Sequence, residues 1–232
     1  MNRTSQAILG TTAIGLLAAA SLGAGPAIAD HSPSGKGAKK AVSLSAELTA
    51  LNGSGASGTA TATVRNQKIL HIEVQASGLT PDAPHAQHIH YGDQALNECP
   101  TLAQDENNDG RINTVEGIPA YGPVVVSLTT SGDTTPESFL AVGRFPVSVD
   151  GQLKYSRSDI EFTDVAGTGY NGGGGTAMQI ADSVREGEGV VVIHGIDYDN
   201  NGMYSFSEEG ASELNSSLPA EATDPTVCGV LR

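Results

Sequence analysis

The sequence predicts an all-β fold, an antiparallel β-barrel or sandwich with Greek-key connections and about eight short strands. Polar and apolar residues alternate along most of its apolar segments, which is the pattern of strands with one buried face. Clusters of Asn, Asp and Gly suited to tight turns separate these segments. The 232 residues are enough for one domain, and the 29 glycines fit a chain with many turns.

The first 40 residues are expected to stand outside this domain. Residues 1–29 combine an early arginine, an apolar run and a small-residue cleavage site, which together predict a secretory signal peptide. Residues 30–40 are rich in Gly, Ser, Pro and Lys and predict a disordered linker. The β domain is therefore expected at residues 41–232 of a secreted, extracellular protein.

The alternation places the strands of the domain in order. The predicted strands cover residues 42–48, 59–64, 69–74, 85–91, 124–128, 139–149, 152–162 and 190–196. Short connections at 52–55, 65–67 and 150–151 join neighbouring strands as hairpins. Only residues 178–185 and 207–217 are predicted to form helices, each of two to three turns.

The charge of the chain limits its partners. Acidic residues outnumber basic ones by 26 to 12, which gives a formal charge of −14. Nucleic acids and anionic membranes need clustered Lys and Arg, so neither is expected as a partner once the signal peptide is removed. Metal ions are the favoured ligands. The sequence does not determine the oligomeric state, and a dimer is compatible with it.

The chain contains two cysteines, Cys99 and Cys228, far apart in the sequence. An oxidising extracellular compartment favours a disulfide between them. Two free thiols or a cysteine-ligated metal are the alternatives.

Two twelve-residue acidic loops match the calcium loop of an EF-hand, with oxygen ligands at positions 1, 3, 5, 7 and 12 and glycine at position 6. The predicted calcium ligands are Asp105, Asn107, Asp109, the Arg111 carbonyl and Glu116 in the first loop, and Asp197, Asp199, Asn201, the Met203 carbonyl and Glu208 in the second. A solvated acidic turn is the alternative for each loop, because Asp, Asn and Gly are common turn residues. Strands and turns are expected before these loops in place of an EF-hand's entering helix.

Histidines form a second candidate site. His88 and His90 are two residues apart on a predicted strand, so both imidazoles lie on one face and can reach the same metal ion. His194 ends another predicted strand, directly before the second loop. His71 is expected to be an ordinary polar residue of a strand.

Several motifs, in order and approximate spacing, resemble those of the copper-zinc superoxide dismutase family. They are Gly78-Leu79-Thr80-Pro81, His85-x-x-His88-Ile89-His90-x-Gly92-Asp93, Cys99, Val191-Val192-Ile193-His194 and Cys228-Gly229-Val230-Leu231. The resemblance implies an eight-stranded Greek-key β-barrel with His88, His90 and His194 as copper ligands. It also implies a structural role for His85 near the copper and an intrasubunit disulfide between Cys99 and Cys228.

The chain departs from that family at the second metal. It has no histidine between Cys99 and Val124, so the family's bridging histidine and zinc ligands are missing and no zinc site of that type is expected. Pro225 stands where the family has an arginine that attracts superoxide. The acidic loops occupy the places of the family's zinc loop and electrostatic loop, so calcium is expected to order them instead of zinc.

Three hypotheses about function follow. The first is a secreted, superoxide dismutase-like metal-binding protein with two calcium sites and a three-histidine copper site. The second is a copper-dependent superoxide dismutase; the missing residues leave enzymatic activity open, and no catalytic residue is assigned. The third is a calcium-stabilised structural or interaction module without a redox metal. Three imidazoles suit copper and zinc almost equally, so the choice of copper depends on the resemblance alone.

Overall fold

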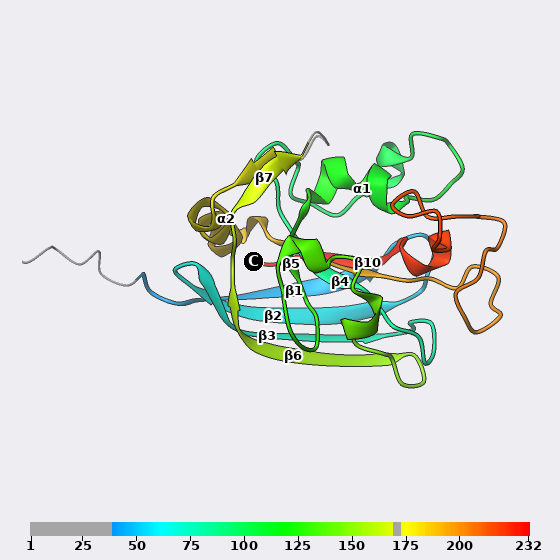
Figure 1. The fold of residues 1–232 in the computed structure, drawn as a ribbon, viewed down its shortest axis with the longest axis horizontal. Coiled ribbons are helices and arrows are strands. Elements are labelled where there is room, and N and C mark those ends of the chain that lie inside the picture. Colours follow the sequence, from blue (N-terminus) through cyan, green and yellow to red (C-terminus); the bar gives the residue numbers. More distant parts are fainter. Residues whose placement is uncertain (1–38, 169–172) are drawn as a thin grey trace, which may run out of the picture. The chain divides into compact units, whose positions relative to one another are not determined.

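The computed structural model describes residues 39–168 and 173–232 (Figure 1). The predicted signal peptide, and all but the last two residues of the predicted linker, lie outside the described residues. Within these ranges, no helix has both the length and the apolar character needed to cross a membrane.

Eight strands of the described chain form one curled antiparallel sheet, a half-barrel, and this confirms the all-β prediction. Their order is β5-β4-β9-β10-β1-β2-β3-β6. Their bounds are β1 Val42–Ala50, β2 Ser57–Arg65, β3 Lys68–Ser77, β4 Gln87–His90, β5 Val124–Ser127, β6 Gln152–Glu161, β9 Val190–His194 and β10 Pro225–Val230. A separate pair consists of β7 (Val165–Thr168) and β8 (Gly173–Gly175), which the sequence pattern did not predict.

The main core follows directly from the alternation in the sequence. In β1, Leu44, Ala46 and Leu48 are buried while the residues between them are exposed. The same pattern in β2, β3 and β6 places their apolar side chains on one face, where they pack against residues of β4, β5 and β9. β9 is buried along its whole length, so it presents a second face to the rest of the molecule.

Helical segments are short and lie outside the sheet. They are α1 Thr114–Tyr121, α2 Ala177–Ser183, a π-helical turn η4 at Val184–Glu188, and the 3-10 turns η1 Leu102–Gln104, η2 Pro136–Ser138, η3 Val142–Arg144 and η5 Ala220–Ala222. α2 with η4 is close to the helix predicted at 178–185. α1 was not predicted. It begins at the end of the first acidic loop, where Asn113 and Glu116 form a capping box.

Two predicted elements are wrong. Residues 139–149 are not a strand, because Gly143 and Pro146 interrupt the alternation and the segment forms η3 and turns instead. Residues 207–217 are not a helix. The Ser212 hydroxyl and the Asn215 amide oxygen accept hydrogen bonds from the backbone N–H groups of nearby residues, which favours turns over a helical ladder.

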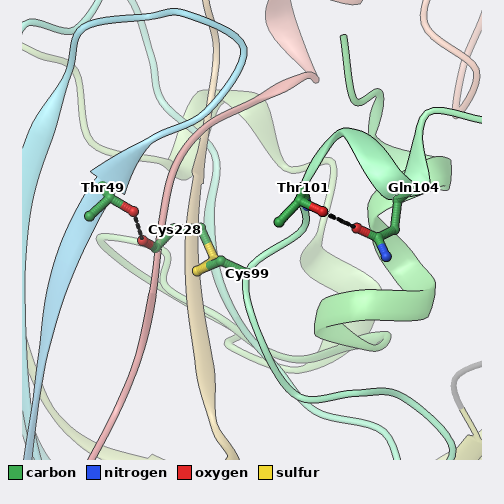
Figure 2. Close-up of a disulfide and its surroundings, with 5 residues drawn as sticks. All are labelled: Thr49, Cys99, Thr101, Gln104 and Cys228. Atoms are coloured by element: carbon green, nitrogen blue, oxygen red, sulfur yellow. Dashed lines mark hydrogen bonds between the residues drawn. A yellow bond between two sulfur atoms is a disulfide. The ribbon is translucent and has the colours of Figure 1, made fainter. Parts of the chain in front are cut away.

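A disulfide joins Cys99 and Cys228, as predicted (Figure 2). The two Cα atoms are 5.7 Å apart, and Cys228 is fully buried on β10. The Thr49 hydroxyl of β1 donates a hydrogen bond of 3.4 Å to the Cys228 carbonyl, so the bridge is attached at the centre of the sheet. The disulfide thereby fixes the segment that leads through η1 into the first acidic loop.

Candidate metal centre

His88 and His90 on β4 and His194 at the end of β9 lie together, and all three are buried. β4 and β9 are antiparallel neighbours, with His88 opposite Val192 and His90 opposite Val190. One nitrogen of each imidazole lies within 4.8 Å of the others. We call these residues the three-histidine cluster.

Each imidazole of the cluster is fixed by a hydrogen bond to a backbone carbonyl. His88 Nε2 is 3.2 Å from the Phe139 oxygen, His90 Nδ1 is 2.8 Å from the Gly122 oxygen, and His194 Nδ1 is 2.6 Å from the Thr223 oxygen. A carbonyl oxygen only accepts, so each of these nitrogens carries the hydrogen. The other nitrogen of each ring is then unprotonated in the neutral imidazole.

Those other nitrogens, His88 Nδ1, His90 Nε2 and His194 Nε2, are buried and have no hydrogen-bond partner. Buried polar atoms normally have partners, so three such atoms in one place are unusual. A histidine that ligates a metal typically donates its second N–H to a carbonyl or carboxylate, which is the arrangement of all three rings. The donor set therefore suits one metal ion.

Burial keeps these imidazoles neutral. It lowers the pKa of His194 to about 4 and, together with the neighbouring His194, lowers the pKa of His90 to about 3. The pKa of His88 is also lowered well below 6.5, by burial first and then by His194 and His90. Metal binding requires deprotonated imidazole nitrogens, so the cluster is in the required protonation state at neutral pH.

A cavity of about 60 Å³ adjoins the cluster. This space exceeds what one water molecule needs, so an ion with a small additional ligand fits. Its walls are mainly apolar, and part of them comes from the two segments whose predicted secondary structure was wrong: Phe139, Leu140, Val142 and Phe145 from one, and Leu214 from the other. The further apolar residues that line it are Pro84, Ala86, Val124, Leu218 and Ala222.

His85 lies behind the cluster and is fully buried. Its two ring nitrogens lie 2.9 Å from the His194 carbonyl oxygen and 3.1 Å from the Thr80 carbonyl oxygen. The Tyr204 ring packs edge-on against it, and a Cβ at Gly195 would come within 2.0 Å of the Tyr204 hydroxyl. His85 therefore contacts the backbone of His194, one of the three histidines of the cluster.

The first acidic loop, residues 105–116, has its oxygens directed inward by its own backbone. Asp105 accepts from the N–H groups of Asp109 at 3.2 Å and Gly110 at 2.9 Å. Glu116 Oε1 accepts from the N–H groups of Glu106 and Asn107, and its Oε2 accepts from Asn113 N–H at 3.0 Å. In the described structure, however, the carboxylates of this loop do not gather within 4.8 Å of one another.

The second acidic loop, residues 197–208, repeats the same backbone pattern. The Asp197 carboxylate accepts hydrogen bonds from the N–H groups of the fifth and sixth residues of the loop, Asn201 at 3.1 Å and Gly202 at 2.7 Å. The fourth and sixth residues of both loops have positive φ: Asn108 61°, Gly110 89°, Asn200 57° and Gly202 87°. Two loops of unrelated flanking structure therefore share one conformation.

The carboxylate that closes the second loop comes from Glu221 of η5, not from Glu208. Glu221 is fully buried, and one of its oxygens lies within 4.8 Å of one oxygen of Asp197 and one of Asp199. It accepts from the N–H of Tyr198 at 3.2 Å and of Ser205 at 2.7 Å, the second and ninth residues of the loop. Glu116 accepts from the second and ninth residues of the first loop. Glu208, predicted as the twelfth ligand, is exposed and lies outside this group.

A second buried carboxylate, Asp224, lies between the loops. Its Oδ2 is paired with the Arg111 guanidinium of the first loop and accepts a hydrogen bond of 3.0 Å from the Tyr198 hydroxyl of the second. Burial raises the pKa of Asp224 to about 7, and these two partners act in the opposite direction. The sequence pattern did not indicate Glu221 or Asp224, because both lie beyond the twelve-residue motif.

Fold and site together define an all-β domain with a curled antiparallel sheet, a buried histidine cluster and two acidic loops. A family model described as the CHRD domain matches residues 40–194. The chain belongs to the CHRD domain family. Comparison with curated proteins gives no match.

The family match corrects the resemblance to copper-zinc superoxide dismutases, which is wrong as a family assignment. The shared motifs lie on strands and turns of a β-sandwich-like domain, and such local patterns recur in proteins of different function. The first hypothesis, a superoxide dismutase-like protein, is wrong for the same reason. The third hypothesis, a structural or interaction module, agrees better with the family.

Proposed function

We propose that this chain is a structural or interaction module of the CHRD type whose acidic loops are ordered by calcium. The observation that carries the proposal is the position of Glu221, a fully buried carboxylate held against Asp197 and Asp199. Three carboxylates so close repel one another unless a cation or protons neutralise them. A hard cation that prefers several oxygens is the ligand that this arrangement suits.

The first acidic loop supports the same function more weakly, since its oxygens follow the EF-hand order and its backbone matches that of the second loop. Secretion, expected from residues 1–29, would place both loops in an extracellular medium. Extracellular calcium modules function with Kd values of about 10⁻⁴–10⁻³ M, so partly exposed loops are adequate there.

Thermal unfolding of the purified protein tests this proposal. At a calcium concentration 100 times Kd, each occupied site adds about 2.7 kcal/mol, so two sites add about 5 kcal/mol. For a domain of this size, that corresponds to a rise in Tm of about 10–20 °C. Magnesium at equal concentration serves as the control, with a much smaller expected rise. An unchanged Tm and unchanged proteolysis of both loops, with calcium or with EGTA, would contradict the proposal.

A second candidate function is supported by the three-histidine cluster. We propose that it binds one transition-metal ion, copper or zinc, as a structural element of the module. Its three buried nitrogens without partners support this, together with the carbonyl that anchors each ring. No redox activity is included in this proposal.

Elemental analysis of protein purified without chelators tests the second candidate. One equivalent of copper or zinc is expected, and the substitution His90→Ala should remove it. His71→Ala is the matched control, because His71 is exposed on β3 and its ring bonds to Ser158 and Glu73, away from the cluster. Protein that contains neither metal, and that gains none on dialysis against either ion, would exclude the site.

A further inference from the structure

The two acidic loops, although separated by 80 residues of sequence, lie at the same end of the sheet (Figure 1). They are linked indirectly, and the link begins at Arg111, the seventh residue of the first loop. Its guanidinium pairs with Asp224 and lies 3.4 Å from the Glu213 carboxylate, and Nη2 is 3.5 Å from the Glu209 carbonyl oxygen. Arg111 thus extends from the first loop to the segment that follows the second.

Asp224 joins the loops through a single atom. Its Oδ2 is the acceptor for both Arg111 of the first loop and Tyr198, the second residue of the second loop. We call these three side chains the Asp224 bridge. Asp224 is fully buried, and its own backbone is fixed, since its N–H donates to Ala220 and its carbonyl accepts from Gly195.

The two partners of Asp224, Arg111 and Tyr198, are also connected to oxygen atoms that are candidate calcium ligands. The Arg111 carbonyl is the predicted seventh-position ligand, and its Nε lies 3.2 Å from Asp109, the fifth-position ligand. The Tyr198 N–H donates to Glu221, the carboxylate that closes the second loop. Movement of either loop away from its binding conformation therefore displaces one partner of Asp224 and disturbs the other.

We infer that Asp224 is a positioning residue that couples the two acidic loops, so that calcium in one loop raises the calcium affinity of the other. This inference rests on the proposed function. The physical reason is that an ion must order its loop, and part of that ordering is shared through the Asp224 bridge. The first ion to bind leaves less ordering for the second. Couplings of this kind usually change affinity by about 5–150-fold.

Calcium titration calorimetry on four full-length proteins tests the coupling. Asp105→Asn disables the first loop, and Tyr198→Phe removes only the hydroxyl that reaches Asp224. In the otherwise unchanged protein, Asp105→Asn should weaken calcium binding at the second loop by at least about 5-fold. In the Tyr198→Phe background, the same substitution should leave the affinity of the second loop unchanged.

A second background, Asp224→Asn, keeps an oxygen for Tyr198 but removes the charge that holds Arg111. It should also abolish the effect of Asp105→Asn. A merely structural role for these residues would lower stability or both affinities without removing the dependence of one loop on the other.

Each alternative result has a separate meaning. If both loops bind calcium but Asp105→Asn does not affect the second loop, the coupling is absent and the proposed function stands. If the coupling persists in both backgrounds, Asp224 does not carry it. If neither loop of the unsubstituted protein binds calcium, the proposed function and the coupling both fail.

Discussion

Substitution of Glu221 by glutamine tests whether the second loop is completed by Glu221, as the structure indicates, or by Glu208, as the sequence motif predicts. The change keeps the shape of the buried side chain but removes its charge and one of its two acceptor oxygens. Glu221 accepts from Tyr198 N–H and Ser205 N–H with different oxygens, so the amide nitrogen must face one of these donors. One loop N–H then loses its acceptor, and the other loses a charged one.

The magnitude follows from these two hydrogen bonds. A hydrogen bond to a charged group contributes about 1.5–3 kcal/mol, so the loss of one such bond and the weakening of the other cost up to about 3 kcal/mol. In the calcium-free protein this cost is partly offset, because the substitution relieves the repulsion of Glu221 with Asp197 and Asp199. For a domain of this length, Glu221→Gln should therefore lower Tm by at most about 12 °C. Loss of a carboxylate ligand should also weaken calcium binding at the second loop by at least about 10-fold, which corresponds to about 1.4 kcal/mol.

Glu208→Gln is the matched control. Glu208 occupies the twelfth position of the motif, but it is exposed and outside the carboxylate group. Its substitution should change Tm by less than about 2 °C and leave calcium affinity within about twofold, as expected for an exposed site. Calorimetric titration and thermal unfolding of both variants provide the comparison. If Glu208→Gln removed the second calcium ion and Glu221→Gln did not, the assignment of Glu221 would be refuted.

Three further predictions concern stability. Two imidazoles of the three-histidine cluster have pKa values lowered to about 3 and about 4, so between about pH 4 and 6.5 the metal-free folded state binds fewer protons than the unfolded state. Its unfolding free energy should be greatest above pH 6.5. On acidification below that value, each of these histidines should lower it by about 1.4 kcal/mol per pH unit. The raised pKa of Asp224, about 7, acts in the opposite direction and offsets the contribution of about one histidine. Urea unfolding at pH 7.5 and 5 measures this, and equal stabilities would contradict it. Replacement of Cys99 and Cys228 by serine opens a link across 129 residues and should lower stability by up to about 5 kcal/mol, seen as a lower Tm than that of the oxidised protein. Gly202→Ala, at a φ of 87°, should cost about 1–2 kcal/mol and weaken calcium binding, whereas an unaffected variant would show that the loop tolerates another conformation.

Much of the fold could be predicted from the sequence because strands with one buried face leave a period of two, as in β1, β2, β3 and β6. The disulfide could be predicted from the expected compartment. The pattern failed at residues 139–149, where Gly143 and Pro146 interrupt the predicted strand and apolar side chains line the cavity beside the histidines. It also failed at residues 207–217, where Ser212 and Asn215 favour turns over a helix.

The residues of the candidate sites, too, could be predicted only in part from the sequence. His88 and His90 could be paired from their spacing on a strand, and residues 105–116 and 197–208 from the order of their oxygens. Glu221 and Asp224 could not be found this way, since tertiary contacts alone bring η5 and the residue before β10 to the loops. The resemblance to superoxide dismutases failed because it relied on short motifs, without the arrangement of the whole domain.

The most direct test of calcium as the ligand that orders this module is the binding stoichiometry of the purified protein, freed of metal and titrated with calcium in a calorimeter. Two equivalents per chain are expected, and Glu221→Gln should retain one of them, at the first loop. Absence of calcium binding at millimolar concentration, in protein shown to be folded by its circular dichroism spectrum, would contradict the account.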